Sequence, residues 1–432
     1  MESATNIAIT FVIFVSVYLL ISLRKIPKIH LDRTVIVLIG ASLVVILKIL
    51  SPHEAIAAIE LNTLILLLGL MIVVVGLELC GFFAWITYKI VYYSRNQCTL
   101  LFLVMALSAF LSAIMLNDAV VLLLTPIIIH TAKKLRINPI PYLIGEAIAA
   151  NIGSVATEVG NPQVAYIAMV SGIPFLIYLS YMAPIAIISF SLACSLVFLI
   201  YWKSLSCELL NREEILENIS NSMFNGGAMD KKELILFKIN IGIVIVLFVG
   251  FVLSSLIGFP LSDVAIGGGI LVLLTYSIIA KYSAKEILSK VDWSIILFFG
   301  GLFVLLKAVE KEGMLTYILS FFPQISQNEQ GIIHLALLTA ILSNIVSNVP
   351  AVILLTPLLL QNGSIEQWLI LASASTLAGN LTFLGSAANV IVLETSKNEG
   401  VHFSPLEFLK AGFPITIITL FVSTLIILLC FT

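Results

Sequence analysis

The chain has 432 residues, of which 60% are hydrophobic and only 11% charged, with a formal net charge of −2. Its mean hydropathy is +1.14. Soluble domains carry about 25% charged residues, so the composition excludes a soluble enzyme, a nucleic-acid-binding protein and a disordered scaffold. We therefore predict an all-α polytopic membrane protein, with the lipid bilayer as its main partner. The five cysteines show no CxxC or other paired spacing, so we expect neither disulfides nor a metal site.

Eight apolar runs have the length, about 20 residues, that a helix needs to cross a bilayer. In chain order they are 7–23, 34–50, 61–79, 175–201, 235–257, 264–280, 293–309 and 405–431. The stretches 100–130 and 331–360 are too long for one crossing and too short for two, so we predict re-entrant hairpins. The stretches 142–169 and 365–394 are interrupted midway by polar residues and Gly. Because freed backbone in a membrane is tolerated only where it lines a cavity, we predict two discontinuous helices, for ten crossings in all.

The basic residues predict the orientation. If the N-terminus lies outside, 19 of the 22 Lys and Arg fall in cytoplasmic segments or at their edges, the exceptions being Lys48, Lys307 and Lys311. The reverse orientation violates the positive-inside rule almost completely. We therefore expect a multi-pass protein of the plasma (inner) membrane, with the N-terminus outside and the hydrophilic stretch 203–233 as a cytoplasmic linker.

Two halves of the chain repeat one another. Residues 111–126 (LSAIMLNDAVVLLLTP) and 342–357 (LSNIVSNVPAVILLTP) are identical at nine of 16 positions. We predict a first repeat over 1–202 and a second over 234–432, each with five crossings and one hairpin. Because five is odd, the second repeat is inverted in the membrane, which is typical of secondary transporters.

The two discontinuous helices correspond more loosely. In them, residues 157–160 (TEVG) align with residues 382–385 (TFLG) after a slip of several residues in the repeat register. Each break therefore falls at a corresponding place in its half, near the middle of the membrane, where such transporters bind their substrates.

Polar side chains gather at the two predicted hairpin tips and the two breaks. An ionisable residue within a membrane costs at least ~2.5–3.5 kcal/mol on insertion scales, so such residues are functional candidates. Half-helix N-termini at these places also direct N–H donors inward. The candidates for substrate and ion binding are Asn117, Asp118, Asn151, Thr157, Glu158, Asn161, Ser347, Asn348, Asn380, Thr382, Ser386 and Asn389.

No Lys or Arg falls at either tip or break. Such a site suits a cation, a proton or a neutral polyhydroxy solute better than a bare multivalent anion. We expect no organic cofactor, with Na⁺ at the hairpin tips or H⁺ as the coupling ion. Asp118 either couples ions or caps its helix, and Glu158 either couples ions or has a structural partner. Glu146 lies near a span end, where we expect it to reach the interface.

Four motifs are shared with a known superfamily: LNDAVVLLLTPII, AIAANIGSVATEVGNPQ, SNVPAVILLTP and GNLTFLGSAANVIV. With them, the chain resembles the ion transporter superfamily, which includes ArsB-type arsenite permeases, NhaD-type sodium/proton antiporters and divalent-anion/sodium symporters. The resemblance implies a scaffold and a mobile transport domain, elevator-like movement and, in many members, a homodimer. It places the substrate and ions between the two hairpin tips and the two broken helices.

The tips resemble the ArsB-type permeases more than the symporters. Symporter tips carry a Ser-Asn-Thr signature, which Asn117, Ser347 and Asn348 match in part, whereas positions 116, 118 and 349 lack its hydroxyl residues. We therefore expect proton- or sodium-coupled export of a small oxyacid, of the arsenite or antimonite type. The alternatives are a sodium/proton antiporter and a sodium-coupled uptake symporter for dicarboxylate, citrate or sulfate.

Overall fold

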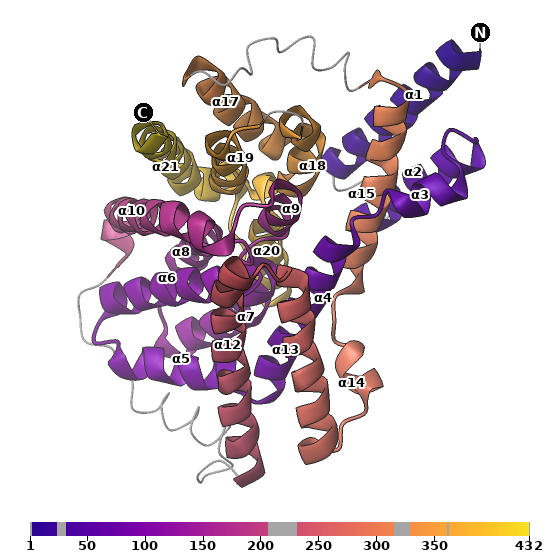
Figure 1. Cartoon of the computed structure of the whole chain (residues 1–432). Coiled ribbons are helices and arrows are strands. Elements are labelled where there is room, and N and C mark those ends of the chain that lie inside the picture. Colours follow the sequence, from indigo (N-terminus) through magenta and orange to yellow (C-terminus); the bar gives the residue numbers. More distant parts are fainter. Residues whose placement is uncertain (1, 24–31, 206–230, 315–328, 361–362, 432) are drawn as a thin grey trace.

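The computed structural model describes residues 2–23, 32–205, 231–314, 329–360 and 363–431, which form helices and no strand (Figure 1). Most of the predicted linker, residues 206–230, lies outside this part. Seven described helices are long and apolar enough to cross a membrane. They are α4 (Leu61–Leu79), α6 (Gln97–Ile114), α10 (Phe175–Tyr201), α12 (Lys231–Ile257), α13 (Leu261–Thr275) with its π-helical extension Tyr276–Ala280, α15 (Trp293–Lys311) and α21 (Pro405–Phe431). The predicted all-α polytopic class is confirmed.

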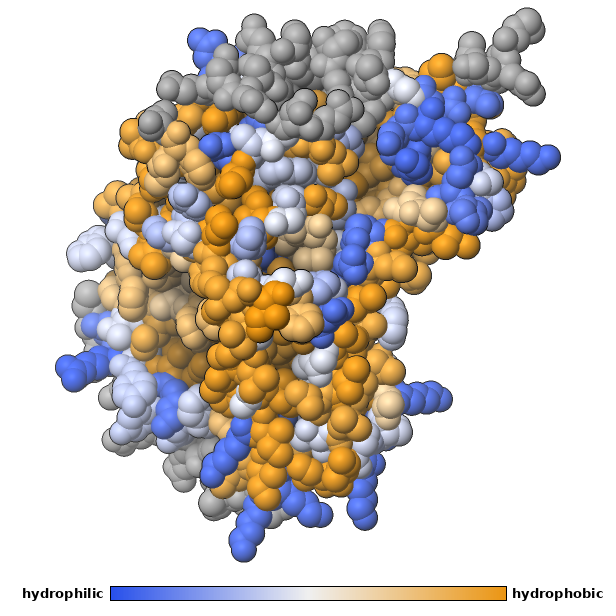
Figure 2. All heavy atoms as spheres, in the orientation of Figure 1, coloured by the Kyte–Doolittle hydropathy of each residue, from blue (hydrophilic) through white to orange (hydrophobic). Residues whose placement is uncertain are grey.

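The outer surface is that of a protein dissolved in lipid. Hydrophobic side chains cover most of the face seen in Figure 2, and hydrophilic ones gather at the lower end and the upper right. Large apolar residues such as Leu199, Ile278 and Leu429 are 73%, 75% and 68% exposed. A soluble protein of this size would bury such contiguous apolar surface, so these side chains face acyl chains.

The long helices pack in two close parallel pairs, α4 with α13 and α15 with α2 (Arg33–Ile46). Small residues make both contacts possible, as is usual for helices in membranes. A Cβ on Gly69 of α4 would lie 2.4 Å from the backbone of Ala265 in α13, and a Cβ on Gly301 of α15 would lie 2.7 Å from the Val37 side chain of α2. Helix α1 (Glu2–Leu23) packs against α2, as α12 packs against α13.

Two helix pairs turn at the polar centres of the predicted hairpins. Helix α6 ends at Ile114 and α7 (Asn117–Leu135) begins three residues later. Helix α17 (Glu329–Val346) is followed directly by α18 (Asn348–Leu359), and between them Ser347 has a φ of 78°. That backbone conformation is uncommon for a residue with a side chain, so packing around Ser347 must offset its unfavourable backbone energy.

Two further pairs are interrupted where the sequence predicts discontinuous helices. Seven residues, 155–161, separate α8 (Ile140–Ser154) from α9 (Pro162–Ser171), and residues 379–386 separate α19 (Ile365–Ala378) from α20 (Ala387–Asn398). Gly153 allows the first of these breaks to lie against α6, because a Cβ there would be 2.0 Å from the Ala109 carbonyl oxygen.

Short helices complete the described chain. They are α3 (Pro52–Ala57), α5 (Phe82–Tyr93), α14 (Ala284–Leu288) and the 3₁₀ turns Trp202–Ser204 and Phe383–Gly385. The helix expected over 34–50 ends at Ile46, because Lys48 adopts a left-handed φ of 61° and turns the chain toward α3.

Candidate functional site

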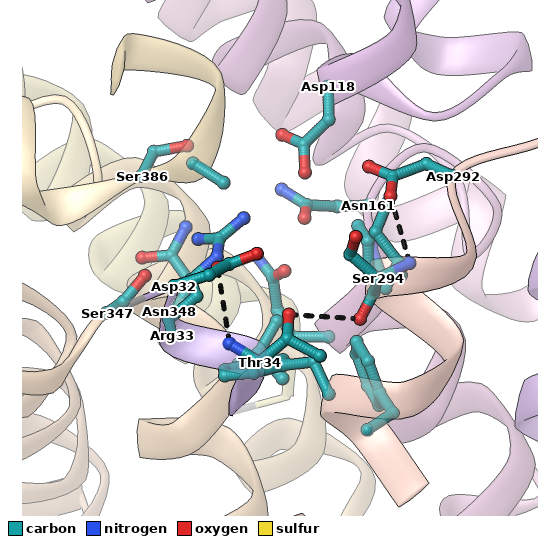
Figure 3. A pocket seen from close by; sticks show the side chains of 17 residues that line it. Asp32, Arg33, Thr34, Asp118, Asn161, Asp292, Ser294, Ser347, Asn348 and Ser386 are labelled. Atoms are coloured by element: carbon teal, nitrogen blue, oxygen red, sulfur yellow. Dashed lines mark hydrogen bonds between the residues drawn. The ribbon is translucent and has the colours of Figure 1, made fainter. Parts of the chain in front are cut away.

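A polar cavity of about 180 Å³ lies where the two turns and the two breaks meet the first residues of α2 and α15 (Figure 3). Asp118 enters from the top of the view, Ser386 from the left, and Asp292 with Ser294 from the right. The lining residues are Asp32, Arg33, Thr34, Asp118, Asn161, Pro162, Gln163, Asp292, Ser294, Ile295, Phe298, Phe299, Ser347, Asn348, Val349, Ser386 and Ala387.

Six of the described helices begin at this cavity. They are α2, α7, α9, α15, α18 and α20, and each contributes residues of its cap or first turn to the lining. The first N–H groups of a helix lack partners within it and carry the positive end of its dipole. Converging helix starts therefore form a cavity that favours oxygen atoms of a ligand.

The amide of Asn151, in α8, joins the first turn to the second break. Its Oδ1 accepts hydrogen bonds from Asn117 Nδ2 (3.0 Å) and Ser386 Oγ (2.9 Å). Its Nδ2 donates to Asn380 Oδ1 (2.9 Å) and Asn389 Oδ1 (3.0 Å). All five side chains are buried, and the network meets the cavity at Ser386, which also lines it.

The two tips are tied to the two breaks by backbone contacts. The backbone N–H of Asn117 donates to the Gly160 carbonyl (3.0 Å). On the other side, the Asn348 side-chain amide lies against the carbonyls of Ser375 and Gly385, at 2.9 and 2.5 Å, and its nitrogen donates to both once the amide oxygen and nitrogen are exchanged. The first tip is therefore bonded to the first break, and the second tip contacts both α19 and the second break.

The predicted site residues fall into three groups. Asp118, Asn161, Ser347, Asn348 and Ser386 line the cavity. The buried asparagine network holds Asn117, Asn151, Asn380 and Asn389.

The other three predicted residues, Thr157, Glu158 and Thr382, belong neither to the cavity lining nor to the asparagine network. Thr157 donates to the Ala113 carbonyl (2.5 Å), Thr382 donates to Asn344 Oδ1 (3.1 Å), and Glu158 does not line the cavity.

The sequence interpretation missed Arg33. Its guanidinium carbon lies 5.5 Å from the centre of the Phe298 ring, a cation–π distance, and it lines the cavity together with Asp118. None of the ion pairs among the described residues involves Arg33. The expectation of a site without a basic side chain is therefore wrong, because α2 begins beside the hairpin tips.

Asp32 and Asp292 were also missed, although a signal for them exists. Each is followed two residues later by a hydroxyl residue, and each caps a helix: Asp32 accepts from Thr34 N–H (3.3 Å) and Asp292 from Ser294 N–H (3.0 Å). Asp before a helix is a usual N-cap. That pattern predicts two helix starts, but not that both face one cavity.

Glu146 does not reach the interface as expected. It is fully buried, and both carboxyl oxygens lie 3.1 Å from the Thr125 hydroxyl. The reason is that α8 is packed by α6, α7, α10, α19 and α20, so Glu146, in the middle of this helix, lies inside the protein. Glu158 is fully buried as well, and neither of its oxygens has a hydrogen-bond partner.

Comparison with known proteins finds membrane transporters that match almost the whole chain. Over 427 residues the chain is 28% identical to an uncharacterised transporter of Mycobacterium tuberculosis, covering 94% of this chain and 95% of that protein. It is 28% identical to a Dictyostelium discoideum transporter named arsB, covering 97% of this chain and 92% of that one. It is 26% identical to a silicon efflux transporter of Oryza sativa subsp. japonica, covering 94% of each.

A family model described as citrate transporter matches residues 18–378. Its members, like the relatives above, are membrane transporters and not enzymes. The chain therefore belongs to the citrate transporter family, within the ion transporter superfamily that its motifs resemble.

Proposed function

We propose that the protein is an elevator-type secondary active transporter that exports a small oxyacid, of the arsenite or antimonite type, coupled to protons or sodium. The observation that carries this proposal is the cavity at which six of the described helices begin. Backbone N–H groups at the helix starts offer donors to the oxygen atoms of a ligand, and helix dipoles strengthen those bonds. Asn161 adds the second hydrogen of its amide, whose first hydrogen is donated to Ser154 Oγ (3.2 Å).

The charge of the cavity favours a neutral oxyacid over a multivalent anion. Arg33 supplies one positive group, but Asp32, Asp118 and Asp292 line the same space. A di- or trivalent anion would meet these carboxylates at short range in a poorly solvated site, where like charges repel strongly. Uncharged As(OH)₃ meets no such penalty and both donates and accepts hydrogen bonds.

The matched packing of the two halves supports inverted repeats with ten crossings and two re-entrant hairpins. Helix α4 packs on α13 as α15 packs on α2, and α6 packs on α8 as α17 packs on α19. In this proposal the scaffold is α1, α2, α4, α12, α13 and α15, and the moving part holds the two turns, the two breaks, α10 and α21. Repeats span 1–202 and 234–432, with the N-terminus outside the plasma membrane and linker 203–233 in the cytoplasm.

The cavity lies between these two parts. Arg33 and Asp292 come from the scaffold, and Asp118, Asn161 and Asn348 come from the moving part. Sliding of one part along the other would carry a bound solute away from Arg33 and toward the opposite side of the membrane. The silicon efflux relative supports export and an uncharged hydroxy-acid substrate, because dissolved silicon at neutral pH is silicic acid.

Arg33 favours a second candidate, a sodium-coupled uptake symporter for dicarboxylate, citrate or sulfate. A guanidinium binds a carboxylate through two parallel hydrogen bonds, and co-bound sodium ions at the hairpin tips would offset the three aspartates. A sodium/proton antiporter, with Asp118 as the exchanged site, is the third candidate. We also propose a homodimer, and the support for it is the resemblance of the sequence to a superfamily with many dimeric members.

The test uses the full chain in proteoliposomes and measures arsenite, silicic acid and citrate accumulation under a pH gradient and, separately, a sodium gradient. We expect proton- or sodium-driven arsenite accumulation that Asp118→Asn abolishes. Asp263→Asn, at an exposed position in the first turn of α13, is the matched control. Sodium-driven citrate uptake would contradict the export proposal and support the symporter, and sodium-triggered proton flux without any solute would support the antiporter.

A further inference from the structure

Glu158 is the one buried acidic side chain among the described residues with no hydrogen-bond partner for either oxygen. It lies in the break between α8 and α9, where the backbone is not helical. The other fully buried glutamate, Glu146, is bonded to Thr125. A buried carboxylate without a partner is far more costly than a buried neutral acid, so this environment demands the neutral form.

The neighbours of Glu158 are satisfied elsewhere. The Tyr178 hydroxyl, from α10, donates to the Val155 carbonyl (3.1 Å), and the Thr157 hydroxyl donates to the Ala113 carbonyl in α6 (2.5 Å). Neither is left to stabilise a negative charge on Glu158.

No described charged group compensates Glu158 either. None of the ion pairs among the described residues involves Glu158. The break therefore holds an isolated acid.

Glu158 is closed off from both nearby spaces. It does not line the polar cavity, although Asn161 at the end of the same break does. On the other side, Thr157 lines an apolar groove of about 570 Å³ between α6, α10 and α12, and Glu158 does not. In this conformation the carboxyl group is thus separated from the substrate cavity and from the lipid-facing groove.

The second half of the chain shows that the fold does not need an acid here. The aligned residue is Phe383, which is 6% exposed and packs against the rings of Phe403 and Phe408, with centroid distances of 5.4 and 4.5 Å. An apolar side chain fills the equivalent place in an equivalent break. The acid is therefore specific to one half, and packing gives no reason for it.

We propose that Glu158 is a proton-binding site separate from the substrate cavity, neutral in this conformation and able to release its proton only when the α8–α9 break moves. Such a site couples a proton to the movement without competing with the substrate for the cavity. This coupling role rests on the proposed transport function, whereas the protonation itself does not. The step is a simple acid dissociation, in which the carboxylic acid yields a carboxylate and one proton.

The first experiment measures protonation without any substrate. Infrared spectra of the full chain in lipid vesicles at neutral pH are recorded for the wild type, Glu158→Gln and the matched control Glu146→Gln. We expect the wild type to show a carbonyl band of a protonated carboxyl group that Glu158→Gln removes and Glu146→Gln retains. Identical carbonyl bands in the wild type and Glu158→Gln would overturn the proposal.

A labelling measurement covers the case in which Glu158→Gln fails to fold. In the Glu146→Gln protein, Glu158 is the fully buried glutamate that remains among the described residues. Carboxyl-¹³C glutamate should then shift a protonated-carboxyl band that persists at neutral pH. Absence of any shifted band would overturn the assignment.

The second experiment tests coupling in proteoliposomes with arsenite as the probe. We expect Glu158→Gln to reduce accumulation driven by a pH gradient to that of protein-free vesicles, while arsenite exchange without a gradient continues. Full proton-driven accumulation in Glu158→Gln would overturn the coupling role. If the wild type moves no arsenite, the proposed substrate fails, and the infrared result still decides whether Glu158 binds a proton.

Discussion

The side-chain amide of Asn151 donates to Asn389 Oδ1 across 3.0 Å, although the two residues are 238 positions apart in the chain. This bond and the bond to Asn380 Oδ1 connect α8 to α20 and to the second break. Together with the bond from Gln163 Nε2 to Thr376 Oγ1 (3.2 Å), they join the two halves of the chain beside the cavity.

We expect Asn151→Ala to destabilise the protein and impair ligand binding. Removing this amide leaves the buried polar groups of Asn117, Asn380 and Asn389 short of partners, at about 1–3 kcal/mol for each unsatisfied group. The check is the thermal unfolding midpoint in detergent together with ligand protection. Asn398→Ala, at an exposed position, is the control and should leave both unchanged; equal midpoints for the two variants would contradict a structural role for the network.

Arg33 is expected to act through hydrogen bonding more than through charge alone. Arg33→Gln should weaken substrate binding by about 1.5–3 kcal/mol, the usual worth of a charged hydrogen bond. Arg33→Lys keeps the charge but not the planar pair of donors, and should restore only part of the affinity. Half-saturation of solute exchange measures the effect, and wild-type affinity in Arg33→Gln would remove Arg33 from the site.

Gly69 tests the close contact between α4 and α13. In Gly69→Ala the new Cβ would lie 2.4 Å from the Ala265 backbone, so the two helices must separate and the protein should lose about 1–3 kcal/mol of stability, as in overpacked cores. Gly267→Ala, in α13, is the matched control because a Cβ there meets nothing within 4 Å. Its unfolding midpoint should be equal to or above that of the wild type, and similar losses in the two variants would argue against the tight contact.

Glu54, in the short helix α3 outside the membrane-spanning helices, makes a pH-dependent contact with Lys311 at the end of α15. The Lys311 ammonium (2.7 Å) and the Ser51 cap hold the pKa of Glu54 at about 2, below its usual value of 4.5. A lowered carboxyl pKa stabilises the folded protein above the usual value, and that contribution is lost as pH falls from 4.5 toward 2. Unfolding midpoints measured over this range should fall less steeply for Glu54→Gln than for the wild type.

Glu312→Gln, beside Lys311 but outside the pair, is the control for that experiment and should keep the wild-type slope. Because the Glu54–Lys311 pair is solvent-exposed, the difference between the slopes should be small and should shrink at high salt. A slope that Glu54→Gln leaves unchanged would show that the contact contributes nothing to stability.

The sequence predicts much of the helix plan because membrane helices follow simple rules of length and polarity. Asn117 and Ser347 lie at the turns, and residues 155–161 at the first break, as the polar interruptions indicate. What the sequence does not predict is which side chains meet across the two halves. The partners of Asn151 come from three separate segments, and such contacts depend on packing between helices far apart in the chain.

The misjudged residues share a physical cause. Arg33 looks like a positive residue at a cytoplasmic helix end, and Glu146 like an acid at a span end, when each segment is considered alone. The position of Arg33 follows from the start of α2 beside the hairpin tips, and the burial of Glu146 follows from the helices that enclose α8. Neither fact can be deduced from one segment alone. Periodicity and span length describe a helix, but not its neighbours.

The helix starts around the cavity have a consequence for how selectivity can change. Every residue except proline, such as Pro162 at the start of α9, keeps its backbone N–H whatever its side chain, so much of the attraction for a solute's oxygen atoms comes from the fold itself. In the proposed function, the choice of solute then depends on a few exchangeable side chains, among them Arg33, Asp118 and Ser347. One scaffold of this kind can be adapted to solutes of different charge by substitutions at single positions, without rebuilding the transporter.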